Sequence, residues 1–329
     1  MGERMFVTGV ASGEIGGNMP QGQPMHDKRR TKRRLQGGLG AIVLFSVVPF
    51  AILLTSVSAG SAAGGTGYVA LGDSYTSGPL IPVQSTNPPG CLRSNHNYPS
   101  DTAVALGLRL TDMSCSGATT AEMYSSQELT SGFANPAQLS ALNVATRVVS
   151  LGIGGDDVGF TSIVENCLAL TPWGPTAVGS TCKGYYDPNG HDALAAAINA
   201  LGPRIVALLQ RIHTLAPSAK IFVVGYPSIL PVSGACWPSM PFETSDAQYL
   251  TAKEIQLNQM LQGEANSHGA TYVDTYAPST SHNACTSEAT RWVEPLVPSS
   301  LAAPIHPNAA GESAVAGLLE RAMQAEGVS

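Results

Sequence analysis

Short apolar runs alternate along the chain with longer segments of mixed polarity. Four runs of apolar and β-branched residues, at positions 68–71, 148–153, 221–224 and 271–274, are too short for helices and end in glycine or polar residues. Such runs predict buried β-strands, and a weaker run predicts a further strand near residues 108–111.

The segments between these runs have helical periodicity. Apolar residues between Leu194 and Ile212 recur with a period near 3.6 residues, and residues 245–267 and 309–325 also read as helices. Buried strands that alternate with amphipathic helices predict an α/β fold whose parallel sheet is covered on both faces. In such a fold the functional residues gather at the carboxyl ends of the strands.

The N-terminal part of the chain follows a different pattern. A basic run at residues 28–34 precedes an apolar stretch at residues 37–55, and small residues follow. This order is typical of an export signal, and Val57-Ser58-Ala59 resembles a cleavage site. We therefore expect a leader at residues 1–65 and one folded domain at residues 66–329.

An uncleaved membrane anchor is the alternative for this leader. The apolar stretch at residues 37–55 approaches the ~20 residues that a helix needs to span a bilayer. Membrane attachment through this stretch would leave the folded domain outside the cytoplasm, as export would. Met25 is an alternative start of the chain, because no apolar pattern precedes it.

The net charge changes where the leader ends. Residues 1–59 hold seven Lys/Arg and three Asp/Glu, so the net charge of −6 for the whole chain leaves −10 on the remainder. Nucleic-acid binding needs clustered Lys and Arg to neutralise phosphates. An acidic domain therefore argues against nucleic acid as a partner.

Cysteine usage agrees with export. An even number of cysteines in an exported chain indicates three disulfides, whose pairing the sequence alone leaves open. No Cys-x-x-Cys is present and no histidine stands at ligand spacing from a cysteine pair, so no metal site is expected. All six cysteines follow the leader: Cys91, Cys115, Cys167, Cys182, Cys236 and Cys285.

Ser74 is the candidate nucleophile. It stands in Gly72-Asp73-Ser74, directly after the first predicted strand. A serine at a tight strand-to-helix turn presents its hydroxyl and its backbone N–H to one point, and the helix N-terminus favours negative charge there. The tripeptide is common by chance, and its position at a strand end is what gives it weight.

His306 is the candidate general base. It stands between two prolines in Pro304-Ile305-His306-Pro307, just before the last predicted helix, which Asn308 can cap. A rigid loop at the carboxyl edge of the sheet suits a base that must meet Ser74. The domain's other five histidines lie in polar loops or helix surfaces, where a solvated role is expected.

Four ordered blocks resemble those of the SGNH (GDSL-type) hydrolases. They are Gly72-Asp73-Ser74, Ser116-Gly117, Gly154-Gly155-Asp156-Asp157 and His306-Pro307. Further segments are similar to secreted actinobacterial lipases and esterases of that family. These are residues 68–78, 91–94, 97–99, 225–227 and 292–295. The resemblance runs from about Tyr68 to Met323.

The resemblance implies a fold and a set of roles. The fold is a flavodoxin-like three-layer α/β/α sandwich with about five parallel strands. Ser74 would attack an ester carbonyl and His306 would take its proton. The N–H groups of Ser74 and Gly117 and a side chain at position 156 would hold the oxyanion. The family also implies sequential disulfides, Cys91–Cys115, Cys167–Cys182 and Cys236–Cys285, the first bracing the Gly117 loop.

Two positions depart from the family pattern. Asp156 replaces an asparagine, and an ionised carboxylate would repel an oxyanion, whereas a neutral one donates a hydrogen bond. A shift in register would instead remove Asp156 from the oxyanion hole. Ala303 stands where many members carry an aspartate three residues before the histidine. A backbone carbonyl, of Ala303 or Pro304, would then orient His306, and the site would be a dyad.

The expected function is therefore that of an extracellular serine carboxylester hydrolase, a lipase or esterase. The alternatives are a carbohydrate acetylesterase and a catalytically weak relative that binds acyl or glycan ligands. Leu168, Leu170, Pro172 and Trp173, between Cys167 and Cys182, suggest an apolar acyl wall or else a small satellite core. No cofactor is implied, and we expect a monomer acting on a small-molecule or lipid ester.

Overall fold

The computed structural model describes residues 66–170 and 182–329. The expected leader at residues 1–65, with its apolar stretch at 37–55, lies outside the described residues, as do Pro172 and Trp173.

Five parallel strands form the central sheet, in the order β2-β1-β5-β6-β7. All five strand predictions are confirmed. The strands are β1 (Gly67–Gly72), β2 (Arg109–Asp112), β5 (Val148–Gly152), β6 (Lys220–Val224) and β7 (Thr271–Val273). A separate antiparallel pair, β3 (Gln127–Glu128) and β4 (Ala134–Asn135), does not follow from the apolar pattern.

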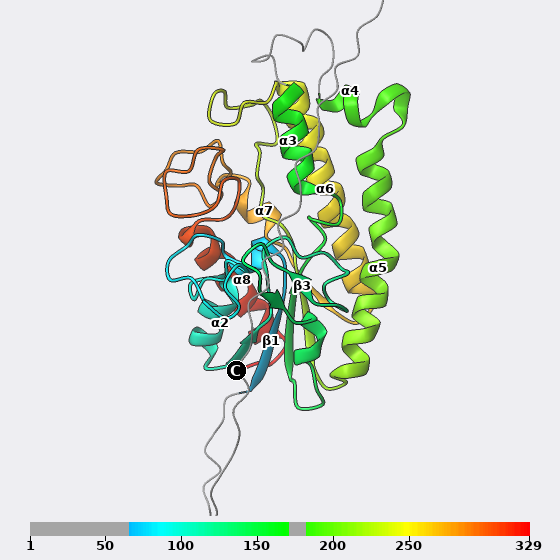
Figure 1. Ribbon diagram of the computed structural model, residues 1–329, viewed down its shortest axis with the longest axis vertical. Coiled ribbons are helices and arrows are strands. Elements are labelled where there is room, and N and C mark those ends of the chain that lie inside the picture. Colours follow the sequence, from blue (N-terminus) through cyan, green and yellow to red (C-terminus); the bar gives the residue numbers. More distant parts are fainter. Residues whose placement is uncertain (1–65, 171–181) are drawn as a thin grey trace, which may run out of the picture. The chain divides into compact units, whose positions relative to one another are not determined.

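Helices cover both faces of the sheet, which gives the expected three layers. On one face α5 (Ala193–Leu215) packs beside α6 (Thr244–Ser267), and on the other α2 (Tyr98–Leu106) packs beside α8 (Ala309–Ala325) (Figure 1). Of these, α5, α6 and α8 are the three predicted helices. The connections contain α1 (Ser74–Ser77), α3 (Phe160–Leu170), α4 (Cys182–Tyr186), α7 (Tyr276–Ser279) and the 3-10 helices η1 (Gln138–Ala141) and η2 (Pro188–Gly190).

The strands are apolar on both sides because both sides are buried. Val69 and Leu71 of β1 belong to the core beneath α5 and α6, whereas Tyr68 and Ala70 belong to the core beneath α2 and α8. Helix α5 is long and apolar enough to cross a membrane by length and composition. Its apolar stripe, including Leu201 and Ile205, is instead buried against the sheet, so α5 is a core helix.

The strand order places a topological switch point at the centre of the sheet. The chain leaves β1 toward one edge through β2, and returns to the other side of β1 as β5. The flavodoxin-like order has the same reversal, and ligands bind outside the carboxyl ends of the strands there. Ser74 follows β1, and Gly154 to Asp157 follow β5, so both candidate blocks lie at this point.

Three disulfides join the cysteines in sequential order, as the family resemblance implies. They link Cys91 to Cys115, Cys167 to Cys182 and Cys236 to Cys285, and they use every cysteine of the chain. Cys91 and Cys115 are buried, and the other two disulfides belong to or pack against a small core of their own, beside Leu230 and Phe242.

Candidate active site

Ser74 begins helix α1, at the tight turn that follows β1. Asp73 caps the helix, because its Oδ1 accepts the backbone N–H of Tyr75 at 2.9 Å. Gly72 has no room for a side chain, since a Cβ there would lie 2.5 Å from the carbonyl oxygen of Gly152. The buried Gln138 side chain holds both the N–H and the C=O of Gly72, at 2.8 and 2.9 Å. The turn is therefore fixed on both sides.

His306 meets Ser74 across 232 residues of sequence. Its Nε2 lies 2.7 Å from Ser74 Oγ, and its Nδ1 lies 2.8 Å from the carbonyl oxygen of Pro304. A carbonyl oxygen can only accept, so Nδ1 carries the proton and Nε2 faces the serine with a lone pair. The other carbonyl considered for this role, that of Ala303, is used differently, because it accepts the backbone N–H of His306 at 3.3 Å.

Glu294 holds the His306 loop from beneath. Its N–H donates to the carbonyl of His306 at 2.9 Å, and its own carbonyl accepts the N–H of Ile305 at 3.2 Å. Ile305 has φ +61°, a strained value for a β-branched residue. Its carbonyl accepts the Tyr75 hydroxyl at 2.7 Å. Burial opposes ionisation of Glu294, but hydrogen bonds from Asn308 and other groups outweigh it and lower its pKa.

The surroundings of His306 favour the neutral imidazole. Burial lowers the pKa of His306 below its ordinary 6.5, and the hydrogen bond to Pro304 opposes this only in part. The rings of Tyr75 and Phe160 lie 4.9 and 6.0 Å from the imidazole, centroid to centroid. A neutral imidazole can accept a proton near neutral pH, which a general base must do.

The Gly117 loop is braced against the turn that carries Ser74. The carbonyl of Cys91 accepts the N–H of Ser116 at 3.0 Å, and the disulfide from Cys91 to Cys115 closes the same loop. The hydroxyls of Ser116 and Ser77 lie 3.1 Å apart, which joins the loop to helix α1. Gly117 has φ +79°, a conformation that favours glycine.

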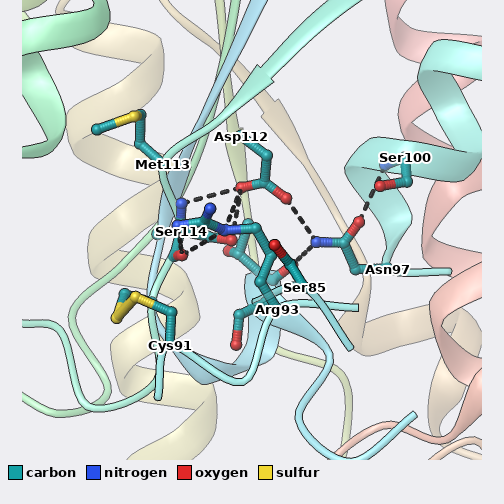
Figure 2. Close-up of polar contacts among 12 residues, drawn as sticks. Ser85, Cys91, Arg93, Asn97, Ser100, Asp112, Met113 and Ser114 are labelled. Atoms are coloured by element: carbon teal, nitrogen blue, oxygen red, sulfur yellow. Dashed lines mark hydrogen bonds and ion pairs between the residues drawn. A yellow bond between two sulfur atoms is a disulfide. The ribbon is translucent and has the colours of Figure 1, made fainter. Parts of the chain in front are cut away.

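A buried polar cluster also connects the segment before Gly117 with helix α1 (Figure 2). Asp112 accepts the N–H and the hydroxyl of Ser114 at 2.9 and 2.6 Å, and on its other side accepts Asn97 Nδ2 at 2.7 Å (Figure 2). Asn97 Nδ2 also donates to the carbonyl of Thr76 in α1 at 2.9 Å. Arg93 donates to the carbonyl of Ser114 and lies 3.6 Å from Asp112.

Asp156 lines the same cavity as Ser74 and is chemically unlike its neighbour Asp157. Burial, followed by the charges of Asp157 and Glu122, raises the pKa of Asp156 to about 6. Within residues 66–170 and 182–329 its side chain makes no hydrogen bond. Asp157 is a structural residue instead, because its carboxylate accepts the N–H and hydroxyl of Thr120 and pairs with Arg204 at 2.9 Å.

Tyr226 connects the blocks that follow β1 and β5, a role that the sequence does not reveal. Its hydroxyl donates to Asp73 Oδ2 and accepts the N–H of Gly155 at 2.8 Å. Asn258 of α6 fixes the Tyr226 backbone with two further bonds, at 2.8 and 3.0 Å. The available signal was the position of Gly225-Tyr226-Pro227 at the carboxyl end of β6, beside the switch point.

An apolar cavity opens at Ser74. Including its mouth it measures about 890 Å³, and Ser74, Asp156 and Ile305 lie in its wall. Most of the wall comes from α3, α5, α6 and the loop after β6, through side chains such as Ile163, Val164, Ile198, Leu230, Met240 and Leu257.

Leu168 packs against a small core that includes Leu230 and Phe242, which is the satellite core considered as the alternative to an acyl wall. Ile163 and Val164 of α3 contact the same core and also line the cavity, whereas Leu168 does not belong to the lining. The side chain of Leu170, like Pro172 and Trp173, lies outside the described part. Among the described residues no group of three or more His, Cys, Asp or Glu is placed to hold a metal ion.

Comparison with known proteins agrees with this geometry. Residues 70–314 match the GDSL-like Lipase/Acylhydrolase family. Lipase 2 of Streptomyces coelicolor is 38% identical over 257 residues, which cover 76% of this chain and 83% of that protein. An esterase of Streptomyces scabiei is 29% identical over 248 residues, covering 66% of this chain and 72% of that protein.

Two solved structures share the fold over nearly their whole length. Phospholipase A1 from Streptomyces albidoflavus is 26% identical with a TM-score of 0.65, covering 78% of this chain and 99% of its own. An extracellular lipase from Streptomyces rimosus is 25% identical with a TM-score of 0.63, covering 80% of this chain and 100% of its own. The family match spans well over half of the sequence, and this chain belongs to the GDSL-like lipase/acylhydrolase family.

Proposed function

We propose that this protein is an extracellular serine carboxylester hydrolase that cleaves acyl esters with a Ser74–His306 dyad. The observation that carries the proposal is the hydrogen-bonded chain from Ser74 Oγ through the imidazole to the Pro304 carbonyl, at 2.7 and 2.8 Å. A nucleophile within hydrogen-bond reach of a base, whose other nitrogen is held by a third group, is the arrangement that nucleophilic catalysis needs.

The reaction has two halves. Ser74 Oγ attacks the ester carbonyl carbon while His306 Nε2 takes the hydroxyl proton, and the carbonyl electron pair moves onto oxygen. When the tetrahedral intermediate collapses, the alcohol leaves with the proton from Nε2 and Ser74 keeps the acyl group. Water then repeats both steps on the acyl-enzyme, which releases the carboxylic acid and restores the serine.

The oxyanion of the intermediate is held by backbone donors in this proposal. Within the described residues, neither the N–H of Ser74 nor that of Gly117 has a hydrogen-bond partner, so both are free to donate. Asp156 is the third donor when its carboxyl group is protonated, which its pKa of about 6 allows in mildly acidic solution. Removing one donor from such a hole typically costs a factor of about 10²–10³ in kcat.

The lining of the cavity favours an acyl chain as the part of the substrate that the protein recognises. Its wall is largely aliphatic and aromatic, with Ser74 near its opening, so the acyl chain of an ester can lie along it. The relatives named lipase and phospholipase A1 agree with such a substrate. A glycan would need polar side chains along the wall, so the carbohydrate acetylesterase alternative is less well supported.

Extracellular action is supported by three observations. Three disulfides persist in an oxidising compartment. The sequence before residue 66 has the order of an export signal. A solved relative is an extracellular lipase.

Hydrolysis of p-nitrophenyl esters from acetate to palmitate tests the proposed function. We expect kcat/KM to rise with chain length beyond acetate, because each added methylene enters the apolar cavity, until the cavity is filled. Ser74→Ala is the control and should be inactive on every ester. Folded protein that hydrolyses none of the series would overturn the esterase proposal, and activity on acetate alone would favour the acetylesterase alternative.

A further inference from the structure

Three loops around the Ser74 site have two faces of different character. They span residues 78–92, 225–242 and 295–307. The inner faces belong to the cavity, through Ile229, Met240 and Ile305 among others. The outer faces also carry large apolar side chains, and these are exposed to solvent.

Six large apolar side chains make up this outer face, which we call the apolar rim. Each is between 49% and 80% exposed, although residues of these types are usually buried. Single exposed apolar residues are normal, but several around one opening are characteristic of an interaction site. The apolar rim consists of Leu80, Val83, Val232, Trp237, Val297 and Leu301.

Backbone hydrogen bonds join the three loops into one surface. The N–H of Ala303 donates to the carbonyl of Pro79 at 3.0 Å, which joins the loop of Leu301 to the loop of Leu80. The N–H of Leu296 donates to the carbonyl of Ser239 at 3.3 Å, which brings Val297 close to the Trp237 loop. The three loops that carry the apolar rim are therefore joined to one another beside the Ser74 site.

The same loops carry no charge. Residues 74–92, 225–242 and 295–311 contain no Asp, Glu, Lys or Arg, and His306 is their one titratable side chain other than tyrosine or cysteine. The chain after residue 59 has a net charge of −10, so the uncharged rim stands out from an acidic molecule. Adsorption to an anionic membrane needs clustered Lys and Arg, which these loops lack.

We propose that the apolar rim docks on a lipid surface without net charge, neutral or zwitterionic, so that ester lipids pass from that surface to Ser74. Shallow insertion removes the exposed side chains from water and costs no desolvation of charge. Docking of the rim would thus mean that the substrate is part of a lipid aggregate rather than a dissolved single molecule. Its purpose rests on the proposed esterase function, but adsorption itself does not need catalysis.

Binding to phosphatidylcholine vesicles tests the apolar rim in a Ser74→Ala background, where the lipid stays intact. All variants carry the same N-terminus, so differences in the partition coefficient report the described residues. Val232→Asp and Val297→Asp, from two different loops, should each weaken binding about tenfold or more, because a charge replaces an apolar group that enters the lipid on binding. Val144→Asp is the matched control: Val144 is 73% exposed but lies before β5, at the amino edge of the sheet.

Several results would overturn the docking proposal. They are an absence of binding by Ser74→Ala, binding to anionic vesicles alone, or equal losses in Val144→Asp and the rim variants. A dimer in solution that Val297→Asp dissociates would show that the rim contacts a second copy instead. With Ser74 intact, the rim variants should hydrolyse soluble p-nitrophenyl acetate at the unaltered rate. If the unaltered protein does not hydrolyse this ester, the esterase proposal is refuted. The vesicle result still decides whether the apolar rim binds a lipid surface.

Discussion

The carbonyl oxygen of Pro304 accepts a hydrogen bond from Nδ1 of His306 at 2.8 Å. A carboxylate in that place would orient the imidazole and also stabilise its cation, whereas a carbonyl supplies the orientation with only a partial charge. His306 is therefore held in the tautomer that a general base needs, with little stabilisation of its protonated form.

This relationship predicts where activity is lost on the acid side. Because burial lowers the pKa of His306 from 6.5, the imidazole stays neutral to lower pH than a solvated histidine. The acid limb of the kcat/KM profile on a soluble ester should have its midpoint below pH 6.5. A midpoint above 7 would mean that a negative charge, and not the Pro304 carbonyl, faces Nδ1.

Asp156 predicts a second, opposite limb. Its carboxyl group donates to the oxyanion only when protonated, and its pKa is about 6, so kcat should fall as pH rises through that value. Together with the limb of His306 this gives a narrow, mildly acidic optimum. Asp156→Asn keeps the shape of the side chain and donates at every pH. It should raise kcat by up to about 10² above neutral pH with little change in KM.

The pH–rate profiles of both forms on one short-chain ester decide this prediction. If the asparagine variant is no faster at any pH, Asp156 is not an oxyanion donor limited by its charge. The register of the segment after β5 would then have to be assigned anew.

Removal of the Tyr226 hydroxyl should lower both stability and kcat. Tyr226→Phe leaves the buried Asp73 carboxylate and the N–H of Gly155 each short of one partner. We expect the free energy of unfolding to fall by about 1–3 kcal/mol and kcat to fall more than KM changes. Tyr185→Phe, at a half-exposed side chain, is the matched control and should have neither effect. Unaltered kcat in Tyr226→Phe would show that Asp73 needs no help from Tyr226.

The disulfide between Cys91 and Cys115 predicts coupled losses of stability and activity. Replacing both cysteines with serine should lower the free energy of unfolding by about 2–4 kcal/mol and also lower kcat, because the Gly117 loop loses its brace. The Cys236–Cys285 pair, replaced likewise, should affect stability with a smaller effect on kcat. Mass spectrometry of the non-reduced protein should find no free thiol. A peptide joining Cys91 to Cys182 would contradict the sequential pairing.

The sequence predicted those parts of the site that depend on local pattern. Ser74 and His306 could be found because strand ends share one edge of a parallel sheet, and each stands at a recognisable boundary. Helix α2 could also have been predicted: Asn97 caps it, Pro99 lies in its first turn and Gly107 ends it with φ +62°. Its weakly periodic sequence concealed it, because only part of one face is buried.

Other parts of the site depend on tertiary packing and leave no local signal. The contact between Tyr226 and Asp73 needs the register of β1, β5 and β6 together with one side-chain conformation. The choice of Pro304 over Ala303 rests on the positive φ of Ile305, which Tyr75 and Glu294 hold from other elements. Glu294 itself reads in the sequence as one more loop residue.

The central claim is that Ser74 is the nucleophile and that His306 activates it. A p-nitrophenyl alkylphosphonate forms a stable bond to such a serine, and the adduct can be located by peptide mass spectrometry. We predict a single adduct, on Ser74, and labelling at least about 10³ times slower in a folded His306→Ala variant. An adduct on another residue, or a labelling rate unaltered by the loss of His306, would contradict the account.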